Sequence, residues 1–244
     1  MANTILSAHQ PIFLPYLGFW SKMKRSDVFV LMDCYPANFG DKNKFDNRNK
    51  IRIGTEKGWQ YITVPIIHTG KQMRFNEIKI DNTQNWQRKI LRALEVNYGK
   101  AKYFKKYYKY IKRVLCAENK RLSELNIKLI FLIKNWLDIK SYVIVQSGGR
   151  WRYSERKKED LKYLFGSASD KIVQLCYNLK IDHFLFGADG KNYADMDLFE
   201  REGIEISFQE YEHPVYEQVY EPFIPQMSVI DALFNIGEKT KELI

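Results

Sequence analysis

Cysteine is scarce in this sequence, and the three that occur show no pattern typical of a metal site or a disulfide. Cys34, Cys116 and Cys176 lie at wide, unrelated spacings, without a CxxC pair or neighbouring histidines. Their odd number and their spacing argue against a disulfide framework and against structural zinc. We therefore predict no metal site, and we expect these cysteines to be core residues.

Apolar runs long enough to cross a bilayer are also absent from the 244 residues. The short apolar run near the N-terminus follows no basic segment, so we do not expect a signal peptide. The chain also lacks a Ser-His-Asp order, a GxSxG elbow and a catalytic-cysteine signature. We expect a soluble, cytoplasmic protein that does not use the common hydrolase nucleophiles.

The composition is that of a folded, basic protein. Hydrophobic residues make up 45% of the chain and aromatic residues 15%, which excludes a disordered chain and allows a large core. The formal net charge of +10 favours anionic partners such as nucleotides, phosphates, RNA or anionic lipids. A solvated, lysine-rich surface explains the same excess, and both interpretations remain open.

Strand and helix patterns alternate along most of the chain. Short apolar runs predict strands at 4–8, 27–33, 51–53, 61–67, 77–80, 142–146, 183–186 and 204–208. Helices are predicted at 17–23, 172–179 and 228–235. This alternation predicts an α/β fold with a mostly parallel, Rossmann-like sheet that is flanked by helices.

The middle of the chain has a different pattern, because apolar residues recur at helical spacing over 86–137. Ser123 is a candidate N-cap for the last of three helices in this stretch. We predict a helical insertion at 83–138 between two parts of one sheet domain, 1–82 and 139–244.

One predicted helix in this insertion interleaves basic and aromatic residues, at 100–113. Its apolar residues fall on one stripe and most of its lysines fall elsewhere, as in an ordinary amphipathic helix with a solvated basic face. We favour that interpretation, and keep contact with RNA or a membrane surface as the alternative.

His9 is the first candidate functional residue. It follows a predicted buried strand and precedes a helix, and open α/β sheets bind their ligands at such positions. An imidazole there can exchange a proton near neutral pH or hydrogen-bond a phosphate. A turn histidine satisfied by the backbone is the alternative, but the position and the flanking prolines favour a functional role.

Two other segments have the residue types of an anion site. Arg48 offers a planar fork for phosphate or carboxylate, and Asn49 offers an amide, in what we expect to be a polar loop. Gly187 and Gly190 directly follow a predicted strand and let the backbone approach a ligand. Neither segment has the spacing of a Walker or dinucleotide loop. A solvated loop and a plain strand-to-helix turn remain the alternatives.

A further cluster of polar residues lies near the C-terminus, at 211–218. It combines His213 with two tyrosines and two glutamates, but lacks the paired spacing of a metal site. Structural packing is the alternative to a functional role for this cluster.

Several segments together resemble the WbqC-like family. They are HQPIFLPYLGFWSKM at 9–23 followed by DVFVLMD, NRNKI at 47–51, WQYITVP at 59–65, GADGKNY at 187–193, FQEYEHPVYEQ at 208–218 and SVIDALFNIG at 228–237. The match spans nearly the whole chain. The sequence departs from the family where a Ser-Gly pair usually precedes the second glycine turn, since Phe186 precedes Gly187 here.

The resemblance implies a role in the biosynthesis of bacterial O-antigen or a related surface polysaccharide, with transfer of glycine or another acyl group onto an amino sugar. Such a transfer needs a base for the amine and donors for the tetrahedral oxyanion. On this interpretation His9 is the base and His213 the second choice. The implied substrate-binding residues are Gln10, Tyr16, Arg48, Asn49, Gly187, Asp189, Gly190, Tyr193 and Tyr216.

The implied partners are a nucleotide-linked amino sugar and an acyl donor, for which an aminoacyl-tRNA is one candidate; no cofactor and no oligomeric state follow. Residues 4–33 also resemble the entry to nucleotidyl-transferring α/β proteins, in which a histidine after the first strand contacts phosphates. Only one of the usual two histidines is present here. An adenylating enzyme is therefore one alternative, and a non-enzymatic nucleotide- or glycan-binding partner of a biosynthetic complex is another.

Overall fold

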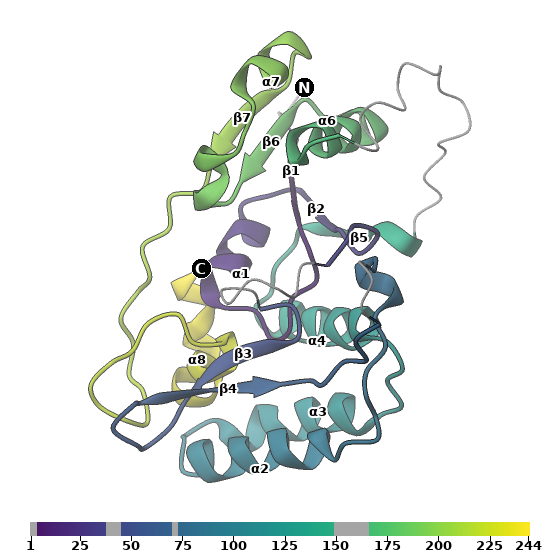
Figure 1. Ribbon diagram of the computed structural model, residues 1–244. Coiled ribbons are helices and arrows are strands. Elements are labelled where there is room, and N and C mark those ends of the chain that lie inside the picture. Colours follow the sequence, from purple (N-terminus) through teal and green to yellow (C-terminus); the bar gives the residue numbers. More distant parts are fainter. Residues whose placement is uncertain (1–3, 38–44, 70–72, 149–165) are drawn as a thin grey trace. The chain divides into compact units, whose positions relative to one another are not determined.

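The computed structural model describes residues 4–37, 45–69, 73–148 and 166–244 (Figure 1). By their internal contacts the residues form two compact units. The sheet unit comprises residues 1–9, 22–32 and 140–212, and the helical unit comprises residues 10–21, 33–139 and 213–244. None of the described helices is long and apolar enough to cross a membrane.

Five parallel strands form the sheet unit, which confirms the predicted α/β fold. The strands are β1 (Ile5–His9), β2 (Val28–Leu31), β5 (Tyr142–Val145), β6 (His183–Phe186) and β7 (Glu205–Phe208). Their order is β5-β2-β1-β6-β7. Numbered along the chain within this sheet, that order is the one found in the first five strands of the Rossmann fold.

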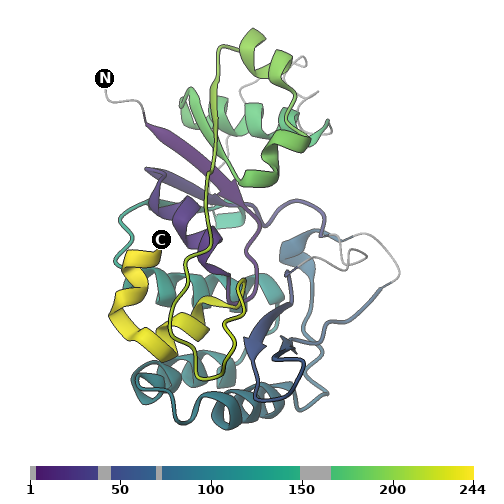
Figure 2. The same ribbon diagram turned by 90° about the vertical axis from the view of Figure 1, so that its left-hand side faces the viewer.

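The core of the sheet unit lies between the sheet and the helices α6 (Ala168–Leu179) and α7 (Met196–Arg201) (Figure 2). Leu6 and Ala8 of β1 and Phe184 of β6 pack in this cluster. Because side chains alternate along a strand, Ser7 and His9 lie on the opposite face. The central strand β1 is therefore apolar on one face and carries polar side chains on the other.

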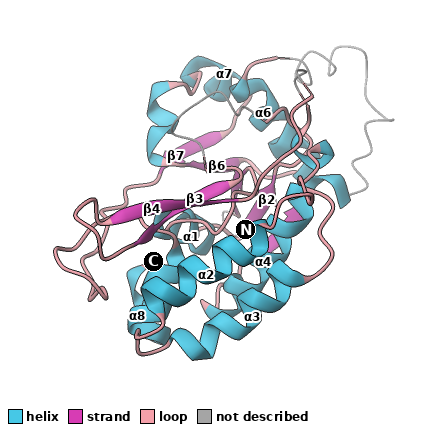
Figure 3. Ribbon diagram, turned by 60° about the horizontal axis from the view of Figure 1, so that its bottom comes forward, coloured by secondary structure: helices cyan, strands magenta, loops and turns pink. Residues whose placement is uncertain are grey.

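The helical unit combines a bundle of helices with a separate antiparallel hairpin (Figures 1 and 3). Its helices are α2 (Trp86–Tyr98), α3 (Phe104–Cys116), α4 (Leu122–Trp136), α8 (Val229–Ile236) and the short turns η1 (Phe75–Glu77) and η6 (Gly237–Leu243). The hairpin strands are β3 (Arg48–Arg52) and β4 (Trp59–Thr63). Helix α1 (Leu17–Lys24) begins in this unit and ends in the sheet unit.

The two units differ in their bounds from the expected division at residues 83 and 138. The β3–β4 hairpin and the C-terminal helix α8 belong with the insertion helices, and the hairpin shares no hydrogen bonds with the parallel sheet among the described residues. The described strands thus form two separate sheets. The prediction that Ser123 is an N-cap was also wrong, because α4 already begins at Leu122 and Ser123 is buried in its first turn.

A buried hydrogen-bonded network holds the C-terminal segment of the helical unit. Asp231 of α8 accepts from the hydroxyls of Tyr98 at 2.7 Å and Tyr216 at 2.8 Å, and from the Gln218 amide at 2.9 Å. The Tyr98 oxygen in turn accepts from the backbone N–H of Arg52 at 2.8 Å. Burial raises the pKa of Asp231. The hydroxyl, amide and carboxylate groups of Tyr98, Tyr216, Gln218 and Asp231 are all paired, so we expect this network to stabilise the fold.

Candidate functional site

The carboxyl ends of β1 and β6 form the topological switch point of the sheet. From β1, the chain builds outward through β2 and β5 on one side and through β6 and β7 on the other. Ile5 pairs with His183 and Leu6 with Phe184. From this register, continued by three residues along strands about 4.8 Å apart, we infer that His9 lies close to Gly187. Open α/β sheets bind their ligands at this point.

Lys22, in the last turn of α1, is the residue at this site that the sequence analysis did not identify. Its side chain is only 6% exposed. The ammonium Nζ donates to the carbonyl oxygen of Ala8 at 2.9 Å and lies 5.8 Å from the centroid of the Phe29 ring. In the part of the chain that the structure describes, no carboxylate forms an ion pair with it. Within the described residues, Lys22 is thus a buried cation without a counter-charge.

Burial lowers the pKa of Lys22 to about 8. A buried charge without an opposite charge is unfavourable, and the nearest acceptor here is a single neutral carbonyl. An anion bound beside Nζ would relieve this cost, because opposite charges interact strongly where water is excluded. The electrostatics of the site therefore favour an anionic ligand.

Gly187 leaves space next to this ammonium. A Cβ atom added at Gly187 would lie 3.9 Å from Lys22 Nζ, whereas one added at Gly190 would lie 2.5 Å from the Cβ of Phe186. Gly190 is therefore required for the turn η5 (Ala188–Asn192) to fold back on β6. At Gly187, by contrast, a Cβ atom would make only ordinary van der Waals contact with the Lys22 side chain, so there is room beside the ammonium.

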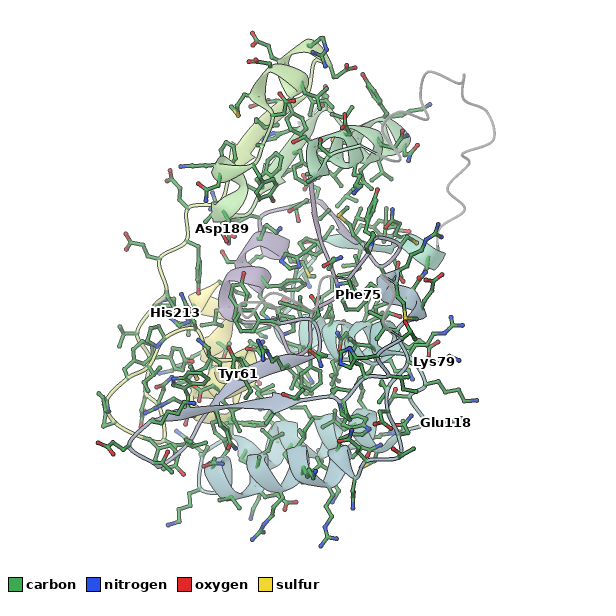
Figure 4. All side chains as sticks on the ribbon, in the orientation of Figure 1. Tyr61, Phe75, Lys79, Glu118, Asp189 and His213 are labelled. Carbon is green, nitrogen blue, oxygen red and sulfur yellow. The ribbon has the colours of Figure 1, made fainter. Side chains whose placement is uncertain are left out.

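Two other predicted residues lie in or after η5. Asp189 is exposed, and Figure 4 labels it at the end of the sheet unit that carries the β6–η5 turn. Tyr193 is 54% exposed, and its ring lies 6.0 Å from that of Phe186. Both side chains are available to a ligand that reaches this turn.

His9 ends β1 and is half-buried. Its backbone carbonyl accepts from the N–H of Met32 at 2.9 Å, which holds the strand end in place. By alternation His9 shares a face with Ser7, whose partner across the sheet is Phe29, the residue that contacts Lys22. Imidazole and ammonium therefore lie on one face of the sheet at its carboxyl edge.

The residues expected around position 48 lie on the β3–β4 hairpin and not in a loop. The Arg48 guanidinium lies 4.4 Å from the centroid of the Tyr61 ring, the latter labelled in Figure 4. Asn49 is fully buried, and its amide donates to the carbonyl oxygens of Phe13 at 3.1 Å and Leu14 at 2.7 Å. Asn49 thus pins the segment in which Leu14 has a positive φ of 44°.

The remaining candidates also use their polar atoms within the helical unit. The Gln10 amide donates to the Pro36 carbonyl at 3.1 Å, and Tyr16 forms an isolated bridge with Ser228. His213 pairs through Nδ1 with the Pro214 carbonyl at 3.0 Å and through Nε2 with the Gln226 N–H at 3.1 Å (Figure 4). Both nitrogens of His213 are engaged by backbone. Tyr216 belongs to the buried network around Asp231.

The predicted residues thus divide between the two units. His9, Gly187, Asp189, Gly190 and Tyr193 belong to the sheet unit with Lys22, and the others belong to the helical unit. That all of them line one pocket stays a prediction. Among the described residues, no group of three or more His, Cys, Asp or Glu is arranged to hold a metal ion.

An all-parallel sheet in Rossmann order, with polar groups at its switch point, defines a doubly wound α/β protein. The chain belongs to the WbqC-like protein family, whose model matches residues 10–243. It is 26% identical over 238 residues to the uncharacterized protein Rv1507c of Mycobacterium tuberculosis (strain ATCC 25618 / H37Rv), a match that covers 96% of this chain and 95% of that protein. No solved structure matches the chain.

Proposed function

We propose that the protein is a cytoplasmic transferase of bacterial O-antigen or surface-polysaccharide biosynthesis. It transfers glycine or another acyl group to the amine of a nucleotide-linked amino sugar. The observation that carries this proposal is the buried Lys22 ammonium at the sheet's switch point, which pairs with no carboxylate of the described residues. Membership of the WbqC-like family supports the pathway.

Lys22 binds a phosphate of the nucleotide-linked sugar in this proposal. A nucleotide sugar carries two phosphates, and these are the anions that an open α/β sheet commonly binds at its carboxyl edge. The space at Gly187 admits a phosphate oxygen to the ammonium. Because the ammonium is desolvated before the ligand binds, little water must be displaced from it.

His9 is the general base of the transfer. The neutral amine of the sugar attacks the acyl carbonyl carbon of the donor, and His9 takes a proton from the attacking nitrogen as the N–C bond forms. The new N–C bond forms as the bond between that carbon and the donor's leaving oxygen breaks. The proton taken up by His9 then goes to the leaving oxygen, so atoms and charge balance. His213 is a weaker candidate, because both of its ring nitrogens are engaged by backbone groups.

An adenylating enzyme is the second candidate, and one observation favours it. The sheet order places the first strand at the centre, and a histidine ends that strand. In this alternative His9 and Lys22 contact the phosphates of a nucleoside triphosphate. Release of pyrophosphate from ATP in the presence of an acyl acid distinguishes it from the transferase, which releases none.

The test is the binding of nucleoside diphosphates to the Lys22→Met variant. UDP, dTDP, ADP and GDP, each paired with its nucleoside, are titrated by calorimetry into the wild-type protein and the variant. A hydrogen bond between charged partners contributes about 1.5–3 kcal/mol, so we expect a roughly tenfold to hundredfold loss of diphosphate affinity. Nucleoside affinity should change little.

Lys24→Met is the matched control, since Lys24 is the exposed lysine two residues further along the same helix. It should bind like the wild-type protein. Equal diphosphate affinity in the Lys22→Met variant and the wild-type protein would contradict the proposal, as would wild-type protein that binds none of the four diphosphates.

A further inference from the structure

The net charge of the chain is concentrated in one segment. Residues 83–138 contain fourteen Lys and Arg against four Asp and Glu, a net charge of +10. The whole chain also has a net charge of +10, so its other residues balance at 25 of each sign. An excess spread evenly over a solvated surface would not show this partition. The concentration of positive charge in residues 83–138 indicates a polyanionic ligand that contacts α2, α3 and α4 or their connections.

The structure arranges part of this charge on one surface, which we call the α2–α3 face. It comprises the exposed cations Arg88, Lys89, Arg92, Lys105, Lys109 and Lys112. The two helices bury their apolar stripes, and the Tyr108 hydroxyl of α3 donates to the Glu95 carboxylate of α2. Figure 3 shows α2 and α3 side by side. The cation rows of both helices therefore face solvent together.

These cations are not neutralised by the described part of the chain. Lys106, which lies off this face, forms an ion pair with Glu238 at 2.5 Å. By contrast, no carboxylate among the described residues pairs with any of the six cations of the α2–α3 face. Lys109 and Lys112 instead lie over the rings of Tyr110 and Tyr108, at 4.9 Å and 5.9 Å from the ring centroids. Such cation–aromatic pairs also offer stacking surfaces to nucleic-acid bases.

A groove borders this face between α2 and the β3–β4 hairpin. Its volume is about 650 Å³, and Arg88, Lys89 and Arg92 line it on the α2 side. Ile53 and Val96 supply apolar lining, and none of the described residues that line it is acidic. Apolar and cationic lining together suit a ligand that alternates flat bases with phosphates.

We propose that the α2–α3 face binds RNA, and that this RNA carries the acyl group of the proposed transfer. The choice of RNA over DNA rests on the proposed function, because an aminoacyl group is activated as an ester of a ribose hydroxyl. An anionic membrane fits less well. A membrane-surface helix presents its apolar stripe to lipid, whereas Phe104, Ile111 and Leu115 of α3 are buried.

The test is the salt dependence of binding to unfractionated tRNA, measured by fluorescence anisotropy with the full chain. The wild-type protein should bind, and the triple variant Arg88→Gln/Arg92→Gln/Lys109→Gln should bind more weakly. Each phosphate contact contributes roughly 0.9 to the slope of log affinity against log salt concentration, so the slope should fall by about 2 to 3. The control is Lys79→Gln/Lys180→Gln/Lys239→Gln, which removes the same charge from exposed lysines outside both helices.

The outcomes separate this inference from the proposed function. The Lys22→Met variant should keep its tRNA affinity, and the triple variant should keep its affinity for nucleoside diphosphates. Absence of tRNA binding, an unchanged slope in the triple variant, or an equal loss in the control would overturn the inference. Tighter binding to phosphatidylserine vesicles or to duplex DNA than to tRNA would overturn it as well.

Discussion

Replacing Lys22 with methionine should stabilise the ligand-free protein at neutral pH, because the change removes a buried charge that has no counter-ion in the part of the chain that the structure describes. Burial lowers the pKa of this lysine from its ordinary value of 10.5 to about 8. That depression corresponds to about 3 kcal/mol against the folded state below pH 8. Loss of the hydrogen bond to Ala8 offsets about 1 kcal/mol. We expect a net gain of about 2 kcal/mol.

The difference in stability between the wild-type protein and the Lys22→Met variant should depend on pH. Between pH 8 and 10.5 the unfolded chain retains the Lys22 proton and the folded protein does not, so the wild-type protein gains stability as pH rises. The methionine variant has no such group. Its advantage should therefore be largest below pH 8 and disappear towards pH 10.5. Other groups titrate in both proteins alike, so the difference between the two isolates Lys22.

Urea-induced unfolding followed by circular dichroism measures this difference at about pH 7 and about pH 9.5. Lys24→Met controls for the loss of a positive charge from the same helix. If Lys22→Met is less stable than the wild-type protein by the same amount at both pH values, the lysine is not an unfavourable buried cation. The electrostatic argument for an anionic ligand would then fail.

Two other substitutions test the remaining assignments. Asn49→Ala should destabilise the fold by about 2–4 kcal/mol, because two buried backbone carbonyls lose their donor; urea unfolding measures this, and a change below ~0.5 kcal/mol would contradict the structural role. His9→Ala should lower the transfer rate by ~10²–10⁴ with little change in stability. His213→Ala should keep most of that rate and lose stability; the reverse pattern of rates would exchange the two assignments.

The sheet was predictable because its strands are short apolar runs with clear ends. The apolar run at 4–8 ends at His9, and Pro11 and Pro15 then prevent a regular helix until residue 17. The strand predicted at 27–33 is β2, Val28–Leu31, and three of its four residues are buried, as the continuous apolar pattern indicated. Topology adds the position of these strands at the centre of the sheet.

The hairpin was predictable only in part. The strands predicted at 51–53 and 61–67 overlap β3 and β4, but four of the five residues of β3 (RNKIR) are polar, so the start of β3 was predicted as a loop. Cross-strand pairing with β4 supplies its order. The start of α4 and the turn at η1 were missed for a related reason. Long-range contacts decide both, since the N–H of Leu122 donates to the carbonyl of Ile78. Such contacts cannot be predicted from the local sequence.

Single residues of the candidate site were also hard to predict from the sequence. Lys22 is one of 39 basic residues, and the sequence shows only that it lies between Trp20 and Met23 in a short helix. For Asn49 and Tyr216 the sequence predicted ligand contacts where the structure shows structural roles. Their residue types suggested ligand contacts, but folding places them in buried hydrogen bonds that hold backbone and helix α8 in place.

The protein has two kinds of cation, which differ in their exposure to solvent and in the ligands that they can bind. The six cations of the α2–α3 face are solvated, so each interacts weakly and in a salt-dependent way, and only a ligand with many phosphates gains much from them. Lys22 is a single desolvated cation, so one phosphate suffices, and salt should affect that contact little. If both proposals hold, raising the salt concentration should release RNA while leaving the nucleotide bound. Loss of both together would mean that the diphosphate also binds to surface charge, and that Lys22 is not its anchor.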